Sequence, residues 1–311
     1  MSRYRDALPQ LSGDPFLTDG GLETTLVFHK GYDLPYFASL VLLETDEGRR
    51  ELSDYCRAYA DLAVQAGAGF VIETPTWRAN PDWMQKLGYD DAGMRDINRR
   101  GVELTAALRP EYEERGTAFV VSGNIGPRGD GYVVGKTMTA DEASAYHDAQ
   151  IATFAETEAD LVTALTMTYA DEATGIVRAA KRHGMPVVIS FTTETDGRLP
   201  SGQRLKDAIE QVDAASDGGP DYYMINCAHT DHFSDSLQAG AAWTQRIRGV
   251  RANASRCSHA ELDEAETLDD GDPTEFGSLY RELKSRFPQL NVFGGCCGTD
   301  ERHIAAINLA A

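Results

Sequence analysis

The residues best suited to chemistry are two adjacent cysteines near the end of the sequence. Cys296 and Cys297 follow the apolar stretch 290–293 and two glycines, a pattern that predicts a buried strand ending in a tight turn. Adjacent cysteines cannot easily bridge each other, because the geometry of a disulfide does not suit a single peptide unit. Two thiols beside glycines suit a soft metal ion better, and a metal needs further ligands.

A third cysteine, Cys227, follows the predicted strand 222–226. If strands six and eight belong to one barrel, their carboxyl ends converge above its axis and bring Cys227 to Cys296 and Cys297. Three thiolates with one open position indicate a reactive zinc site, since structural zinc sites are closed by four protein ligands. These three cysteines are therefore the predicted metal ligands and catalytic residues, whereas Cys56 and Cys257 are expected to be inert.

An all-sulfur zinc site with an open position favours chemistry on sulfur. Three thiolates donate enough charge to make zinc a poor activator of water. The metal still holds a substrate thiol as thiolate near neutral pH, although free thiols titrate at about 8.5. The ligand set therefore predicts alkyl transfer to a substrate thiol rather than hydrolysis.

The elements that position these cysteines alternate along the whole chain. Eight predicted strands alternate with eight helical stretches, which favours a parallel sheet closed into a (β/α)8 TIM barrel, in one domain over residues 1–311. An open doubly wound sheet is the alternative, but no glycine-rich nucleotide fingerprint follows the first strand. The acidic segment 255–272 predicts a long loop in the seventh unit.

The predicted bounds follow from apolar runs, helical spacing and capping residues. The strands are 16–19, 69–74, 118–123, 161–167, 186–192, 222–226, 247–253 and 291–294. One helix begins after Thr139, with Glu142 completing a capping box. The other helices are 51–67, 92–115, 171–184, 204–217, 232–246, 275–286 and 300–309.

Composition limits the partners and the location. With 29 basic and 49 acidic residues, the net charge of −20 argues against nucleic acid and anionic membrane surfaces as partners. No apolar run approaches the roughly 20 residues of a membrane span, and no signal peptide is visible, so we expect a soluble cytoplasmic protein. Few lysines and many aspartates are typical of salt-adapted proteins, a hypothesis that a melting series in salt tests. Homo-oligomerisation is left open.

Three motifs together resemble those of the zinc-dependent homocysteine S-methyltransferase family. They are Asp19-Gly20-Gly21-Leu22, Asn226-Cys227 and Gly294-Gly295-Cys296-Cys297-Gly298. The resemblance covers nearly the whole chain and implies a (β/α)8 barrel, a zinc cofactor, homocysteine as the methyl acceptor and methionine as the product. We expect a freely diffusing sulfonium or ammonium donor, such as S-methylmethionine or S-adenosylmethionine, because these residues include no domain for a cobalamin.

The acceptor is expected to lie among strand ends and glycines beside the cysteines. The resemblance implies that Asp19 holds the amino group of homocysteine. It also implies a glutamate after the fourth strand, but Leu165 stands in that place. A lost charged hydrogen bond costs about 1.5–3 kcal/mol, so homocysteine is expected to bind more weakly, or another thiol is the acceptor. The candidate substrate-binding residues are Asp19, Gly20, Gly21, Thr74, Asn226 and Gly295, with Thr76 and Asn124 as further polar candidates.

Two other functions are alternatives. A zinc-dependent hydrolase or lyase would need histidine or carboxylate ligands and an acid–base residue, but the seven histidines form no HxH or HExxH pattern. His229, near Cys227, could be a ligand or a proton carrier, but a solvated loop residue is expected. Glu23 could compensate for the acid missing at Leu165, but a surface residue is expected. A non-catalytic zinc- or thiol-binding homologue is the second alternative, suggested by Leu165.

Overall fold

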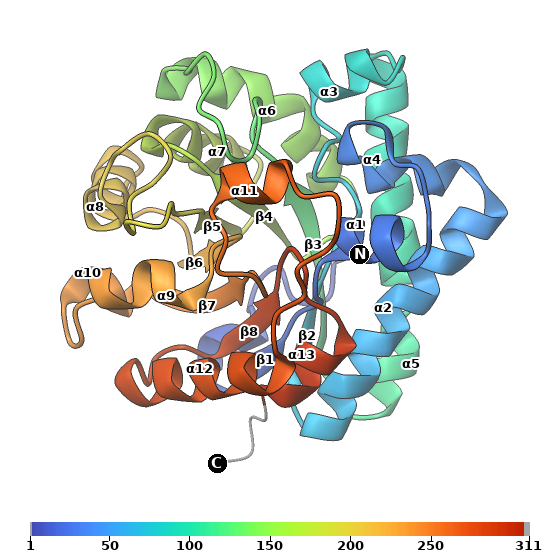
Figure 1. Cartoon of the computed structure of the whole chain (residues 1–311). Helices are drawn as coiled ribbons and strands as arrows, with labels where there is room; N and C mark the ends of the chain where they lie inside the picture. The colour runs from blue at the N-terminus through green and yellow to red at the C-terminus, as the bar shows by residue number, and fades with distance from the viewer. Residues whose placement is uncertain (1, 308–311) are drawn as a thin grey trace.

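Eight parallel strands form a closed ring, in which each strand pairs with its neighbours in sequence and β1 pairs with β8 (Figure 1). The computed structural model describes residues 2–307. The predicted (β/α)8 barrel is confirmed, and every predicted strand lies within two residues of an observed one. The strands are β1 (Phe16–Leu17), β2 (Gly69–Glu73), β3 (Phe119–Ile125), β4 (Leu161–Met167), β5 (Val187–Phe191), β6 (Tyr222–Asn226), β7 (Ile247–Ala252) and β8 (Val292–Gly295).

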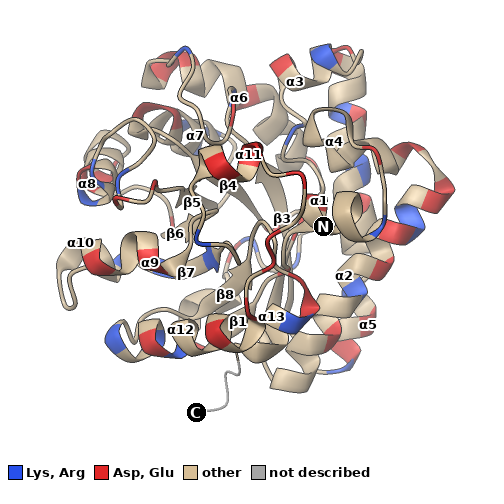
Figure 2. Cartoon of the chain, viewed as in Figure 1, with Lys and Arg blue, Asp and Glu red and all other residues tan. Residues whose placement is uncertain are grey.

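Helices surround the barrel and carry most of the charged side chains (Figures 1 and 2). The predicted capping box of Thr139 and Glu142 is confirmed at the start of α6. The longer helices are α2 (Asp46–Ala66), α4 (Asp91–Ala106), α6 (Ala140–Ala155), α7 (Ala170–Arg182), α8 (Leu205–Ala215) and α12 (Pro273–Arg286). The shorter ones are α1 (Leu22–Thr24), α3 (Pro81–Lys86), α5 (Arg109–Glu114), α9 (Thr230–Phe233), α10 (Ala242–Gln245), α11 (His259–Asp263) and α13 (Glu301–Ala306).

Two predicted helices are wrong in detail. The stretch 92–115 is divided into α4 and α5, because Pro110 lacks the N–H that a continuing helix needs and instead stands in the first turn of α5. The stretch 232–246 forms α9, a 3₁₀ turn and α10, with Gly240 at a φ of +77° between the last two. Of the last predicted helix, α13 is observed, and residues 308 and 309 lie outside the described residues.

The barrel interior changes from apolar to polar along the strands. A cluster of apolar side chains fills the half near the amino ends: Leu8, Phe16, Val71, Val120, Leu161, Val188, Tyr222, Met224 and Val292. Buried polar side chains follow toward the carboxyl ends: Asp19, Glu73, Ser122, Thr163, Ser190, Asn226 and Arg251. Buried polar groups need partners, and the active sites of such barrels lie at the carboxyl ends of the strands. This polar layer therefore adjoins the expected functional site.

The loop after β7 contains the short helix α11 and borders the mouth of the barrel (Figure 1). It corresponds to the long loop predicted for residues 255–272. Among residues 2–307, no helix is both long and apolar enough to cross a membrane.

Candidate metal centre and active site

The three predicted metal ligands meet at the mouth of the barrel. Cys227 follows β6, and Cys296 and Cys297 follow β8; their Sγ atoms all lie within 4.8 Å of one another. Cys227 has a φ of +54°, a left-handed conformation that residues other than glycine seldom adopt. Strained conformations of this kind persist where the surroundings hold them, and they concentrate at functional sites.

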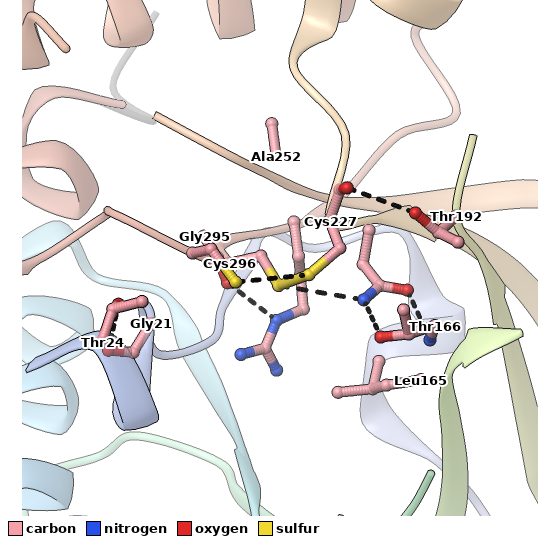
Figure 3. Close-up of a disulfide and its surroundings, with 12 residues drawn as sticks. Gly21, Thr24, Leu165, Thr166, Thr192, Cys227, Ala252, Gly295 and Cys296 are labelled. Atoms are coloured by element: carbon pink, nitrogen blue, oxygen red, sulfur yellow. Dashed lines mark hydrogen bonds between the residues drawn. A yellow bond between two sulfur atoms is a disulfide. The ribbon is translucent and has the colours of Figure 1, made fainter. Parts of the chain in front are cut away.

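Cys227 and Cys296 are joined by a disulfide in the structure, and Cys297 is free (Figure 3). This differs from the three free thiolates expected from the sequence, although the adjacent pair is unbridged as predicted. Metal ligation requires thiolates, so the three cysteines would bind a metal only after this disulfide is reduced. Three converging sulfurs that border a cavity fit a soft metal ion after reduction.

Asn226 fixes the strand ends beneath the sulfurs. Its Oδ1 accepts from the Thr166 backbone N–H at 2.9 Å and from Ser190 Oγ at 2.6 Å. Its Nδ2 donates to Thr166 Oγ1 at 2.9 Å and faces Cys296 Sγ at 3.9 Å. The amide therefore connects β4, β5 and β6 to the cysteine cluster. Its role in substrate binding stays a prediction.

Tyr132 borders the sulfurs and was not found by sequence reasoning. Its Oη lies 3.2 Å from Cys297 Sγ and 3.6 Å from Cys227 Sγ. Its ring stacks on His259 of α11 with centroids 4.1 Å apart, and His259 Nε2 lies 2.6 Å from the Cys227 carbonyl oxygen. Tyr132 belongs to the loop between β3 and α6, and no sequence pattern marks it.

A buried charge cluster lies in the polar layer of the barrel. Arg251 Nη2 donates to Asp19 Oδ1 at 2.6 Å, and Tyr55 Oη donates to Asp19 Oδ2 at 3.2 Å. Burial alone would lower the pKa of Arg251, but Asp19 and Glu73 outweigh that effect and raise it. Burial raises the pKa of Glu73 to about 7, although Arg251 opposes the rise. A charged residue inside a predicted strand was the available sequence signal for Arg251, since buried charges need partners.

A cavity of about 550 Å³ opens above these groups. Its lining includes the predicted residues Asp19, Gly20, Gly21, Thr74, Asn124, Asn226 and the three cysteines, together with Leu165, Arg251 and Tyr132. Gly295 and Thr76 are not in the lining: the Gly295 carbonyl accepts from Arg251 Nε at 3.1 Å, and Thr76 Oγ1 donates to the Asn124 carbonyl at 2.8 Å.

Two predictions about residues near the site were wrong. His229 is 3% exposed rather than solvated, because its Nδ1 accepts from the Asp231 N–H and caps α9. Glu23 is partly buried in the cavity wall rather than on the surface, and it accepts from Ser39 Oγ at 2.7 Å. Neither residue belongs to the sulfur cluster.

Comparison with known proteins places the chain in a family. The family model described as homocysteine S-methyltransferase matches residues 16–311. The chain belongs to the homocysteine S-methyltransferase family. The family motifs that the sequence analysis identified therefore coincide with the cavity and its sulfur cluster.

Individual relatives of this family are more distant. The chain is 27% identical over 270 residues to a methionine synthase of Mycobacterium tuberculosis, covering 79% of this chain and 20% of that protein. It thus spans about a fifth of the length of the curated relative it matches. The metallated form of the homocysteine methyltransferase MmuM from Escherichia coli superposes with a TM-score of 0.74 at 22% identity, covering 98% of this chain and 99% of that one. The oxidized form gives 0.73 over 96% of each chain. These superpositions support the fold.

Proposed function

We propose that this protein transfers a methyl group from a diffusible sulfonium or ammonium donor to the thiol of homocysteine, giving methionine, and that it depends on zinc. The observation that carries the proposal is the convergence of Cys227, Cys296 and Cys297 on one cavity, within 4.8 Å of one another. The family model and the names of the two relatives support homocysteine as the acceptor.

Cys227, Cys296 and Cys297 would hold the zinc ion after reduction of the disulfide. When bound there, zinc would lower the pKa of an acceptor thiol and keep it as thiolate near neutral pH. The three ligands disfavour hydrolysis, since thiolate donation makes the ion a poor activator of water. The residues around the cysteines supply positioning: Asn226 fixes the strand ends, and Tyr132 contacts two of the sulfurs.

The reaction is a displacement at the methyl carbon. The acceptor sulfur, as thiolate, forms a bond to that carbon while the bond from the methyl carbon to the donor sulfur or nitrogen breaks. The electron pair of the broken bond leaves with the donor, which becomes neutral, and the thiol proton goes to solvent. No oxidant or reductant is consumed, so the task of the protein is mainly to orient two substrates.

The lining of the cavity that the cysteines border supports a cationic donor. It is lined by the aromatic residues Phe28, Tyr36, Phe37, Trp77 and Trp83 and by the acidic residues Glu23, Asp130, Asp263 and Asp269. Phe28 is 43% exposed and Tyr36 is 53% exposed, whereas the Arg78 guanidinium already lies 4.0 Å from the Trp77 ring and 3.9 Å from the Trp83 ring. Aromatic faces and carboxylates both attract cations such as sulfonium and quaternary ammonium groups.

The proposal is tested by a donor panel with the reduced, zinc-loaded protein. Homocysteine is offered with S-methylmethionine, S-adenosylmethionine or a quaternary ammonium donor, and methionine is measured. Methionine formation that disappears with chelation and returns with zinc supports the proposal. Equal methyl transfer by metal-free protein contradicts zinc dependence, and thiol binding without transfer from any donor contradicts the enzymatic role.

A further inference from the structure

Arg251 carries an unused hydrogen-bond donor at the border of the active-site cavity. Its Nη2 donates to Asp19 Oδ1 at 2.6 Å, and its Nε donates to the Gly295 carbonyl at 3.1 Å. Nη1 has no hydrogen-bond partner, although the side chain is only 5% exposed. A buried guanidinium N–H without an acceptor is unfavourable, so an anionic group on a ligand in the cavity would complete this site.

Neither of the two acids that the family resemblance assigns to the amino group of the acceptor is free to bind it here. Asp19 is 4% exposed and already accepts from Arg251 and from Tyr55 Oη. The second acid expected, at the end of β4, is replaced by Leu165, which lines the cavity (Figure 3). One of these carboxylates is thus held by Arg251 Nη2, and the other is absent, while Glu23 and Glu73 are further acids in the cavity lining.

Arg251 lies next to the cysteine cluster. Gly295, whose carbonyl holds Arg251 Nε, directly precedes Cys296, and both Arg251 and the three cysteines line the same cavity. A short molecule that places its thiol at the sulfurs therefore has a cation within the same enclosed space. The planar guanidinium suits a carboxylate, because its N–H groups have a fixed geometry that matches the two oxygens.

We propose that Arg251 binds the carboxylate of the acceptor, and that the acceptors are short thiol carboxylic acids whose amino group adds little to binding. This inference rests on the proposed function, because it takes a thiol as the group held at the cysteines. Homocysteine is one member of this class, and thiol acids that lack an amino group are others.

Glu73 supports the opposite arrangement, in which the protein binds the amino group of the acceptor. Its Oε2 is also buried without a hydrogen-bond partner, and its carboxyl interacts electrostatically with Arg251. If Glu73 took up the amino group of an amino acid acceptor, that group would become essential for binding. The two arrangements therefore give opposite results when the amino group is removed.

Three thiols separate these outcomes. Homocysteine, 4-mercaptobutyrate (which lacks the amino group) and 3-aminopropane-1-thiol (which lacks the carboxylate) are titrated calorimetrically into the reduced, zinc-loaded full chain. We expect 4-mercaptobutyrate to bind within about fivefold of homocysteine and 3-aminopropane-1-thiol to bind at least about tenfold more weakly, as the loss of a charged hydrogen bond predicts. A loss of more than about fivefold for 4-mercaptobutyrate, or none for 3-aminopropane-1-thiol, overturns the inference.

Substitutions test whether Arg251 causes this difference in affinity between the thiols. The double variant Asp19→Asn, Arg251→Gln removes the buried ion pair as a unit. We expect it to bind both carboxylates about tenfold more weakly and to leave 3-aminopropane-1-thiol unchanged. Arg248→Gln, on the same strand but outside the cavity lining, is the matched control. Equal weakening of all three thiols would mean that Arg251 only supports the fold, and would overturn the inference.

Two further measurements keep the test decisive. If the double variant does not fold, Arg251→Lys retains the charge but loses the fixed N–H pair, and an intermediate loss confined to the two carboxylates is expected. Unchanged carboxylate affinity in Arg251→Lys overturns the inference. Calorimetry needs no methyl donor, so normal thiol binding without methyl transfer contradicts the proposed function alone. Methyl transfer with amino-dependent binding contradicts this inference alone.

Discussion

Tyr132 Oη lies 3.2 Å from Cys297 Sγ, which connects the loop after β3 to the cysteine pair after β8. Burial raises the pKa of Tyr132 well above its ordinary value, so its hydroxyl stays protonated and donates to sulfur. Burial also raises the pKa of Cys297 to about 11, and the Tyr132 hydroxyl opposes that rise. A tyrosine thus helps to stabilise the thiolate that a metal requires.

Replacing Tyr132 with phenylalanine should therefore weaken metal binding. Partners of metal ligands typically change affinity by about 10- to 100-fold when removed, and we expect at least the lower value for Tyr132→Phe. Chelator competition on the reduced protein measures it. Tyr4→Phe is the control, because Tyr4 donates to Glu113 away from the cavity lining. An unchanged zinc affinity in Tyr132→Phe would show that the contact with sulfur is incidental.

Replacing Cys297 with serine should remove zinc and methyl transfer together. Cys297 is the free thiol of the cluster, and without it two sulfur ligands remain. We expect zinc content after dialysis to fall from about one ion per chain to nearly none. Cys257→Ser should keep both metal and activity, because Cys257 lies in the loop after β7 outside the cluster. Methyl transfer by metal-free Cys297→Ser protein would contradict the mechanism.

Local sequence was sufficient for the barrel and for the convergence of the three cysteines. Strands β4 and β6 have the predicted bounds, because apolar runs bounded by turn residues mark buried parallel strands. The convergence of Cys227 with Cys296 and Cys297 followed from strand order. The single helix predicted for residues 232–246 is wrong. The same spacing of apolar residues also occurs in successive short turns, and Gly240 interrupts the chain between them.

The charge cluster was beyond sequence reasoning because its partners are distant in the chain. Asp19 and Arg251 are 232 residues apart, and only the closed ring pairs β1 with β8, which in turn pairs with β7. The same limit applies to Tyr132, which contacts Cys227 across 95 residues from a loop. The disulfide between Cys227 and Cys296 likewise joins residues 69 positions apart in the sequence.

Replacing Leu165 with glutamate should restore selection for an amino group. Leu165 lines the cavity where the family resemblance places an acid, and a charged hydrogen bond is worth about 1.5–3 kcal/mol. We expect the ratio of kcat/KM for homocysteine over 4-mercaptobutyrate to rise by about tenfold or more. Leu165→Gln has a similar size without the charge and should leave the ratio nearly unchanged. A rise of the same size in both variants would exclude an electrostatic cause.

Glu73 should make the stability of the protein depend on pH. Its pKa is raised by burial from an ordinary 4.5 to about 7, so between these values the folded state holds a proton that the unfolded state has lost. The stabilising effect of the protonated carboxyl is complete below about pH 4.5 and is lost as the pH rises through about 7. Glu73→Gln cannot ionise and should avoid this loss.

The difference in unfolding free energy between Glu73→Gln and the parent protein isolates that effect. At 1.36 kcal/mol per pKa unit, the variant should gain about 2–3 kcal/mol relative to the parent between pH 5 and pH 8. Urea unfolding of the reduced, metal-free proteins at both values measures it without interference from zinc release. Any constant offset from lost attraction to Arg251 cancels in this comparison. A difference that does not change with pH would mean that Glu73 ionises in the folded protein as readily as in water, and that Arg251 fully compensates its burial.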